Sequence, residues 1–105
     1  MAWRIGWVNP AWDDLDSAAE YISRDSPRYA AAFTREVLKS VSSLRQFPRH
    51  GRIVPEFDDP SLRELIVQSY RLIYRIRGNK ITILGLIHGA RDLPRLWKRE
   101  RRDEN

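Results

Sequence analysis

The sequence of 105 residues contains no cysteine and only two histidines. Disulfides and thiolate-bound metals are therefore excluded, and His50 and His88 are too far apart in sequence to suggest a shared metal site. We expect neither a metal nor a cofactor. A chain without cysteine suits a reducing compartment, so the expected location is the cytoplasm.

Long apolar runs are missing as well. No stretch approaches the length of a membrane-spanning helix, and the N-terminus MAWRIGWV lacks the apolar core of a signal peptide. We therefore expect no membrane partner. Hydrophobic residues make up 42% of the chain and charged residues 31%, which is ordinary for one soluble globular domain.

Acidic residues are outnumbered. The chain has 19 lysines and arginines against 14 aspartates and glutamates, and its net charge is +5. The excess lies in the C-terminal half, because residues 91–102 are rich in arginine and lysine whereas residues 9–25 are rich in carboxylates. A positive field favours a polyanion such as RNA or DNA, or an acidic protein partner.

A β-hairpin is predicted for the stretch SYRLIYRIRGNKITILGLIHGAR, with arms at 70–77 and 80–88. Gly78-Asn79 supplies the two-residue turn, and pairing of Arg77 with Lys80 fixes the register. One face is then expected to hold Tyr70, Leu72, Tyr74, Ile76, Ile81, Ile83, Gly85 and Ile87. The other is expected to hold Arg71, Ile73, Arg75, Arg77, Lys80, Thr82, Leu84, Leu86 and His88. The first face is a core, and the second is a half-open cationic surface where functional residues are expected.

The segments before the hairpin alternate between strand and helix patterns. Residues 3–8 alternate as a strand, and Asn9-Pro10 is typical of a helix start with Asn9 as the N-cap. Ser26-Pro27 predicts a second helix by the same logic, which should run through Phe47 and pack antiparallel to the first. Residues 48–61 form an irregular connection to a strand at 62–67. A tight turn at Gln68-Ser69 then leads into the hairpin and places Glu64 opposite Ile73.

The order β-αα-βββ predicts an α+β fold. A helical hairpin should pack on one face of a largely antiparallel four-stranded sheet, with the place of the first strand left open. We expect one domain over residues 1–94 and a basic C-terminal tail over 95–105, which is either a short helix or frayed.

Several local patterns, in this order and spacing, resemble the RelE/ParE superfamily of bacterial type II toxins. They are Ala11…Asp14-Leu15 with Tyr21-Ile22, Leu44…Pro48…Gly51-Arg52, Leu62-Arg63-Glu64-Leu65, Tyr70-Arg71-Leu72-Ile73-Tyr74-Arg75 and His88-Gly89-Ala90-Arg91-Asp92. The resemblance covers roughly residues 3–92. It implies a RelE/ParE-like fold and a toxin neutralised by an antitoxin encoded beside it. RelE-like members cleave mRNA in the ribosome, whereas ParE-like members, the plasmid-stabilisation branch, inhibit DNA gyrase by binding.

The nuclease branch is matched only in part. Cleavage of RNA by 2′-hydroxyl attack needs a base, an acid and cations around the phosphate. The RelE-like pattern implies lysines on the strand before the hairpin, arginines on the next two strands and a tyrosine near the C-terminus. Arg71 and Arg91 match its arginines. However, the strand at 62–67 has no lysine. Trp97 stands where the tyrosine is expected, and an indole cannot replace a phenol in proton transfer.

His88 is the remaining candidate acid or base, because imidazole titrates near neutral pH and its predicted face also holds Arg71 and Arg75. The alternative is a ring that hydrogen-bonds a carbonyl at the strand end. If the protein is a nuclease, its catalytic residues are expected to be Arg71, His88 and Arg91.

The residues expected to bind a target or partner are Arg71, Arg75, His88, Arg91 and Trp97. The arginines suit phosphate or acidic side chains, and the alternative for them is a solvated strand face. Trp97 is either an anchor for a partner or folded back onto the sheet. We favour a ParE-like toxin that binds gyrase and a cognate antitoxin. The alternatives are a ribosome-dependent mRNA endonuclease and a non-toxic basic nucleic-acid-binding module.

Overall fold

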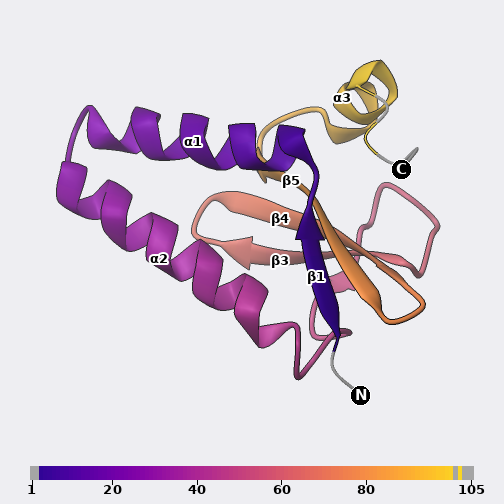
Figure 1. Ribbon diagram of the computed structural model, residues 1–105. Helices are drawn as coiled ribbons and strands as arrows, with labels where there is room; N and C mark the ends of the chain where they lie inside the picture. Colours follow the sequence, from indigo (N-terminus) through magenta and orange to yellow (C-terminus); the bar gives the residue numbers. More distant parts are fainter. Residues whose placement is uncertain (1–2, 101, 103–105) are drawn as a thin grey trace.

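The computed structural model describes residues 3–100 and 102, which form an α+β domain (Figure 1). Its elements are β1 (Arg4–Trp7), α1 (Asn9–Ser23), α2 (Pro27–Ser43), β2 (Arg52–Ile53), β3 (Leu62–Val67), β4 (Tyr70–Arg77), β5 (Lys80–His88) and α3 (Leu93–Glu100). The strand order is β1-β5-β4-β3-β2, with β1 parallel to β5 and the other pairs antiparallel. The expected class is confirmed. The sheet has five strands rather than four because the short β2 pairs with Arg63 and Glu64.

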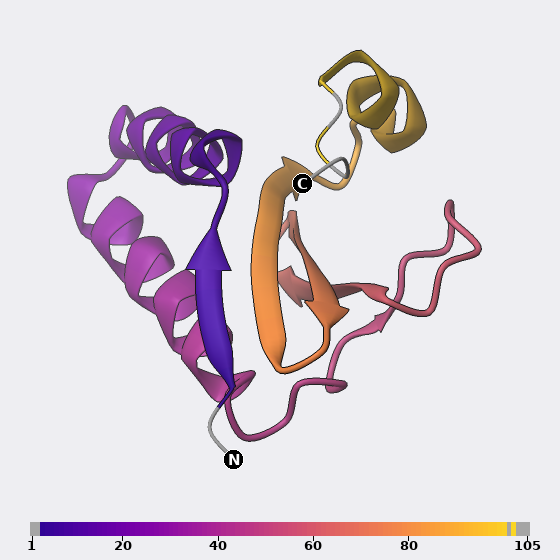
Figure 2. The same ribbon diagram turned by 45° about the vertical axis from the view of Figure 1, so that its right-hand side comes forward.

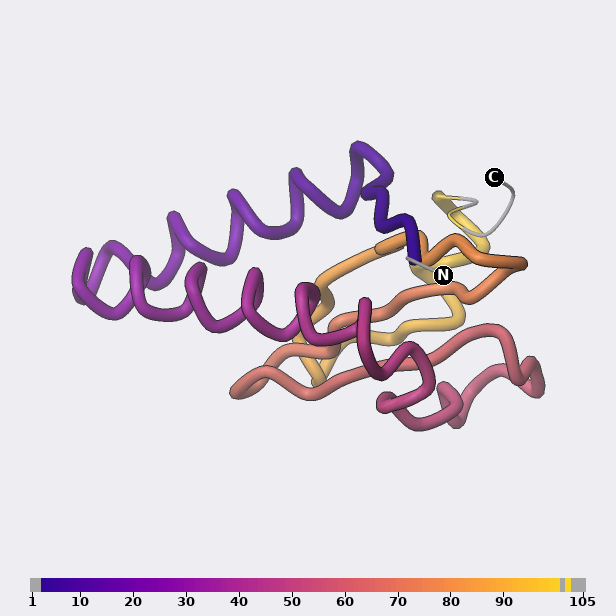
Figure 3. The backbone as a smooth tube through the Cα atoms, turned by 60° about the horizontal axis from the view of Figure 1, so that its bottom comes forward, coloured from indigo at the N-terminus to yellow at the C-terminus, as the bar shows by residue number. Residues whose placement is uncertain are grey.

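The helical hairpin packs on one face of this sheet, as expected. Figure 3 shows α1 and α2 side by side and antiparallel, with α1 over β5 and α2 over β3. Ser26 caps α2 by accepting from the Tyr29 amide at 3.2 Å, but α1 begins one residue early, with Val8 at the cap position. The α2 helix ends at Ser43 instead of Phe47. No helix among residues 3–100 is long and apolar enough to cross a membrane.

The hydrophobic core under the helical hairpin combines small and branched side chains from both layers. It contains Ala11, Leu15, Ala18, Phe33, Val37, Val41 and Leu44 from the helices and their ends, with Val67, Leu72, Tyr74, Ile76, Ile81, Ile83 and Leu86 from the sheet. The β3 and β4 strands follow the expected register, with Glu64 opposite Ile73. The predicted turn is also present: Arg77 pairs with Lys80, and Gly78 has a φ of +62°.

A β-bulge interrupts the hairpin and overturns part of the predicted face assignment. Tyr74 pairs with Ile83 and Ile73 pairs with Gly85, so Leu84 is left without a partner. The alternation of β5 therefore shifts beyond residue 84.

Four assignments were wrong for this reason, the first being Gly85, which pairs with Ile73 and so does not share the face of Tyr74. Leu86 belongs to the core under the helices, whereas Ile87 lies on the opposite face. His88 pairs with Tyr70, and their ring centroids are 5.3 Å apart. His88 therefore does not share the face of Arg71 and Arg75.

The face turned away from the helical hairpin is covered, so the half-open cationic surface expected there is absent. Ile73, Leu84 and Ile87 form a second core with Val54, Leu62, Leu93, Leu96 and Trp97. Figure 2 shows α3 and the connection between β2 and β3 on the side of the sheet opposite α1 and α2. The open choice at the C-terminus is decided in favour of a helix. The expected boundary between residues 94 and 95 falls inside α3.

Candidate functional site

Arg71 lies at the centre of a buried ion-pair network. Its position on β4 turns the side chain away from the helical hairpin, because Leu72 and Tyr70 on either side face that way. The guanidinium is not open to solvent. Nη1 and Nη2 donate to the two carboxylate oxygens of Glu56 at 2.7 and 2.6 Å, and Nε donates to Glu64 at 2.6 Å. Only 9% of the side chain is exposed.

Glu64 is the other centre of this ion-pair network. Its side chain is fully buried on β3, and its second carboxylate oxygen accepts from Nε of Arg52 at 2.6 Å. Arg52 remains 63% exposed. Two cations and two carboxylates thus balance one another, so the network carries no net charge.

The hydrogen bonds that Arg71 donates to Glu56 raise the pKa of its guanidinium, and Glu64 acts in the same direction against the effect of burial. The same bonds lower the pKa of the Glu56 carboxyl below its ordinary value. Both groups are therefore charged at neutral pH. Arg71 is a structural cation whose hydrogen-bonding fork is already filled.

Arg75 is also buried, at 8% exposure, where the sequence predicted a cationic surface. Its Nη1 lies 3.8 Å from a carboxylate oxygen of Asp59, and its Nε has no hydrogen-bond partner. Hydrogen bonds from Ser61 lower the pKa of Asp59, with a smaller contribution from Arg75. Arg75 therefore does not offer a free guanidinium to a partner in this conformation.

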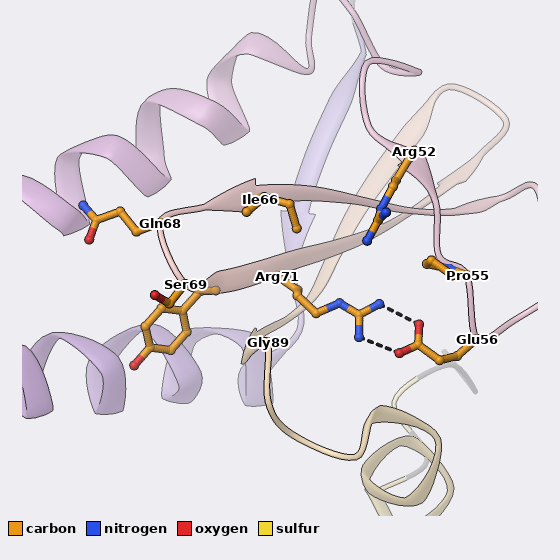
Figure 4. Close-up of a pocket in the computed structure, with 9 residues that line it drawn as sticks. Arg52, Pro55, Glu56, Ile66, Gln68, Ser69, Arg71 and Gly89 are labelled. Carbon is orange, nitrogen blue, oxygen red and sulfur yellow. Dashed lines mark hydrogen bonds and ion pairs between the residues drawn. The ribbon is translucent and has the colours of Figure 1, made fainter.

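A cavity of about 310 Å³ opens beside the Arg71–Glu56 pair (Figure 4). It is lined by Arg52, Pro55, Glu56, Ile66, Gln68, Ser69, Tyr70, Arg71 and Gly89. The cavity lies next to the end of β3, and Ile66 at its rim is 57% exposed.

His88 and Arg91 line a different cavity of about 240 Å³, together with Asp14, Ser17 and Arg102 among others. Both residues are exposed. The Nδ1 atom of His88 accepts from the Ala90 amide at 3.1 Å, which leaves Nε2 for a proton or another partner. The expected alternative of a bond to a strand-end carbonyl is thus replaced by a bond to a backbone amide.

The C-terminal end of the structure closes this second cavity. Arg102 forms ion pairs with Asp14 and Glu100, and its guanidinium lies 5.6 Å from the centre of the Trp97 ring. Asp14 also accepts from the Leu86 amide at 2.9 Å. One carboxylate at the start of α1 therefore joins the helix, β5 and the C-terminal segment.

Trp97 folds back onto the sheet, as one of its two expected alternatives required. It is 2% exposed, and its ring lies 6.2 Å from that of Phe57. Its role in this structure is to hold α3 in place. The exposed side chains of α3 are instead the basic Arg95, Lys98 and Arg99.

The structure does not gather the three residues expected to be catalytic in a nuclease. Arg71 and His88 project to opposite faces of the sheet, and only His88 and Arg91 share a cavity. Within residues 3–100 and 102, no cluster of three or more potential metal ligands is present.

Sequence reasoning missed the two acidic partners of Arg71. Glu64 could have been found, because the predicted register places it opposite Ile73 and thus on the face of Arg71. Glu56 could not, because it lies on an irregular connection that no periodicity locates.

The family model for the ParE toxin of the type II toxin–antitoxin system parDE matches residues 5–93. The chain belongs to this family. The match extends from β1 to the first residue of α3 and includes every residue that lines the cavity beside Arg71.

Solved structures show the same fold. A chain of the chromosomal ParDE toxin–antitoxin system from P. aeruginosa is 24% identical to this chain, with a TM-score of 0.67. The match covers 82% of this chain and 95% of that one. A chain of the toxin–antitoxin complex RelBE2 from Mycobacterium tuberculosis is 22% identical with a TM-score of 0.58, covering 84% and 99% respectively. Comparison with curated proteins gives no significant match.

Proposed function

We propose that this chain is a toxin that inhibits DNA gyrase by binding in the cytoplasm, and that a cognate antitoxin neutralises it. The observation that carries the proposal is the family match over residues 5–93. The two related structures support an antitoxin partner, because one comes from a toxin–antitoxin system and the other from a toxin–antitoxin complex. Inhibition by binding requires an exposed contact surface but no assembled proton-transfer site.

The state of the candidate residues supports binding over RNA cleavage. A nuclease needs free cations around the phosphate and a proton donor within reach of it. Arg71 and Arg75 are buried beside carboxylates, and His88 is on the other face. Neither buried ion pair leaves a free guanidinium for a scissile phosphate.

We assign target contact to the exposed cations at the C-terminal end of the fold. They are Arg91 after β5 and Arg95, Lys98 and Arg99 on α3. We assign to the same contact the exposed His88, the last residue of β5. Arg71, Arg75 and Trp97 act from beneath this surface, since they hold the connection between β2 and β3 and the helix α3 against the sheet. Exposed cations at one end of the fold suit an acidic region of a target protein.

A supercoiling assay with purified gyrase tests this assignment. The wild-type chain should block supercoiling, and the double variant Arg95→Glu, Lys98→Glu should weaken inhibition at least tenfold because it reverses charge at the proposed contact. Arg28→Glu, Arg35→Glu on the exposed side of α2 is the matched control and should inhibit normally.

Full supercoiling at a large excess of folded wild-type protein would refute gyrase as the target. Cleavage of mRNA on translating ribosomes, lost in His88→Ala, would replace the proposal with the endonuclease alternative. Normal growth after induction of the protein would favour the non-toxic nucleic-acid-binding module.

The antitoxin is proposed to cover the groove of the helical hairpin or to extend the edge of the sheet through an acidic or amphipathic segment. Exposed apolar side chains on the hairpin, Tyr21, Tyr29 and Leu38, support the first of these surfaces. Co-expression of the neighbouring reading frame should restore growth and yield a stable complex on size-exclusion chromatography. Failure of every adjacent small protein to bind would contradict this partner.

A further inference from the structure

The outer edge of β3 is only partly covered. Among the described residues, β2 pairs with β3 at Arg63 and Glu64 alone, and no strand lies outside Leu65–Val67. Ile66 in this segment is 57% exposed, and Ile53 on β2 is 42% exposed. An unpaired edge with apolar side chains is a template for an extended peptide segment.

The ion pair of Arg71 with Glu56 lies beside this edge. Ile66 pairs directly with Arg71, and both line the cavity of about 310 Å³ (Figure 4). A segment lying along Leu65–Val67 therefore passes the Arg71 fork. Its side chains on this face would reach the position that the Glu56 carboxylate now fills.

Glu56 can leave this position without a change of the backbone. It lies in a turn in which the Phe57 amide donates to the Val54 carbonyl at 3.2 Å, and Val54 is fully buried. The turn is thus anchored at both ends, since Phe57 also packs against Trp97. The Glu56 side chain itself is 31% exposed, so rotation about its own bonds carries the carboxylate into water.

Arg71 cannot lose Glu56 without a replacement. A buried guanidinium whose N–H groups have no acceptor destabilises the fold, because neither water nor a protein group replaces the lost hydrogen bonds. Among unmodified protein side chains, only another carboxylate satisfies the fork with the same bidentate geometry and charge. This requirement gives selectivity, since a neutral side chain from a passing segment cannot displace Glu56.

We infer that Glu56 occupies, within the chain, the binding position of a partner protein's carboxylate. The partner segment is extended, carries one acidic side chain flanked by apolar ones, and pairs with Leu65–Val67 while its carboxylate replaces Glu56 on Arg71. The inference rests on the proposed function, because the partner assigned to the site is the antitoxin.

The surroundings favour a protein segment over a nucleic acid. Binding of a phosphate backbone relies on several unpaired cations along its path. Here Arg71 and Glu64 are buried in a neutral network, and the rim is formed by Ile66, Pro55 and Gln68. The apolar side chains of Ile66 and Pro55 beside one bidentate cation fit a peptide with alternating acidic and apolar side chains.

The test measures binding of the purified antitoxin from the neighbouring reading frame to the full-length chain and its variants. Glu56→Gln removes the competing carboxylate and should tighten binding about tenfold, because the binding-competent state no longer has to be opened. Asp58→Asn is the matched control: it removes the same charge from an exposed position two residues away and should leave affinity within about twofold. Ile66→Ser should weaken binding at least threefold through loss of the apolar contact.

The outcomes separate this inference from the proposed function. If the antitoxin binds the wild type, Glu56→Gln and Asp58→Asn with equal affinity, the exchange of carboxylates is overturned and the antitoxin proposal stands. Tightening by both variants would assign the effect to long-range charge and overturn the exchange as well. Absence of binding by any form, each shown to be folded by circular dichroism, would refute the antitoxin partner and the inference together.

Discussion

Substitution of Glu64 by glutamine probes whether the cations of the sheet are structural. The buried carboxylate accepts from Arg71 on one oxygen and from Arg52 on the other, both at 2.6 Å. Glutamine preserves the shape of the side chain, but its amide nitrogen faces an N–H donor where an oxygen acceptor stood. One of the two hydrogen bonds is therefore lost, together with the negative charge.

The cost is set by Arg71 rather than Arg52. Arg52 is 63% exposed, so water replaces its lost interaction and solvent screens the pair. Arg71 is 9% exposed, but it keeps both hydrogen bonds to Glu56. One charge-assisted bond to a buried group is worth about 1.5–3 kcal/mol. We expect Glu64→Gln to lower the free energy of unfolding by about 2–3 kcal/mol, below the ~3–5 kcal/mol that follows when a buried pair is broken completely.

Urea unfolding at pH 7, followed by tryptophan fluorescence, measures this difference. The midpoint should fall while the slope with denaturant stays constant. The control is Glu36→Gln, an exposed residue of α2 that should stay within about 0.5 kcal/mol of the wild type. A loss below about 0.5 kcal/mol in Glu64→Gln would refute the reasoning, since it would mean that the buried network contributes nothing to folding.

Three further predictions concern Tyr74, Gly51 and Glu56. Tyr74 donates to the Pro48 carbonyl and accepts from the Gly51 amide, both at 2.9 Å, so Tyr74→Phe should cost about 1–3 kcal/mol in urea unfolding. The matched control Tyr29→Phe, at a 70% exposed position, should show no loss. Gly51→Ala should lower the thermal midpoint by several degrees, about 4–8 °C per kcal/mol, because its Cβ would lie 2.6 Å from a backbone oxygen of β3 and 2.7 Å from the phenol oxygen of Tyr74. The pKa of Glu56 is lowered from its ordinary 4.5, so its stabilising contribution is present above about pH 4.5 and is lost as the pH falls through the folded-state value. As the pH is lowered, the free energy of unfolding should therefore fall less steeply in Glu56→Gln than in the wild type. Equal slopes in the two proteins would contradict the ion pair.

The sequence was sufficient for features that local chemistry determines. Gly78 and Pro27 mark a turn and a helix start through backbone restrictions that act within a few residues. The register across Gln68-Ser69 follows from the shortness of the turn, and with it the pairing of Ile66 with Arg71. These rules place strands, helices and their order without knowledge of distant contacts.

The rest depended on contacts between distant segments. The bulge at Leu84 has no local signature, and one extra residue was enough to exchange the faces of Leu86 and Ile87. The position of Glu56 depends on an irregular connection anchored by Val54 at one end and Phe57 at the other. Arg71 could be placed on a face by counting, but its burial depends on these two distant features. The strand pattern therefore predicted the position of Arg71 but not its burial.

The bulge also explains why the arginines of β4 are buried and the exposed positive charge lies on α3 instead. Without the extra residue, Leu86 and His88 would lie on the same face as Arg71 and Arg75. That face would then be too polar to be buried and would be exposed to solvent. With it, Leu84 and Ile87 complete an apolar platform on which Trp97 docks. Docking of Trp97 fixes α3, whose remaining side chains are then the exposed cations. A variant that lacks Leu84 should consequently lose the platform first, releasing α3 and with it the charged surface that we assign to target contact.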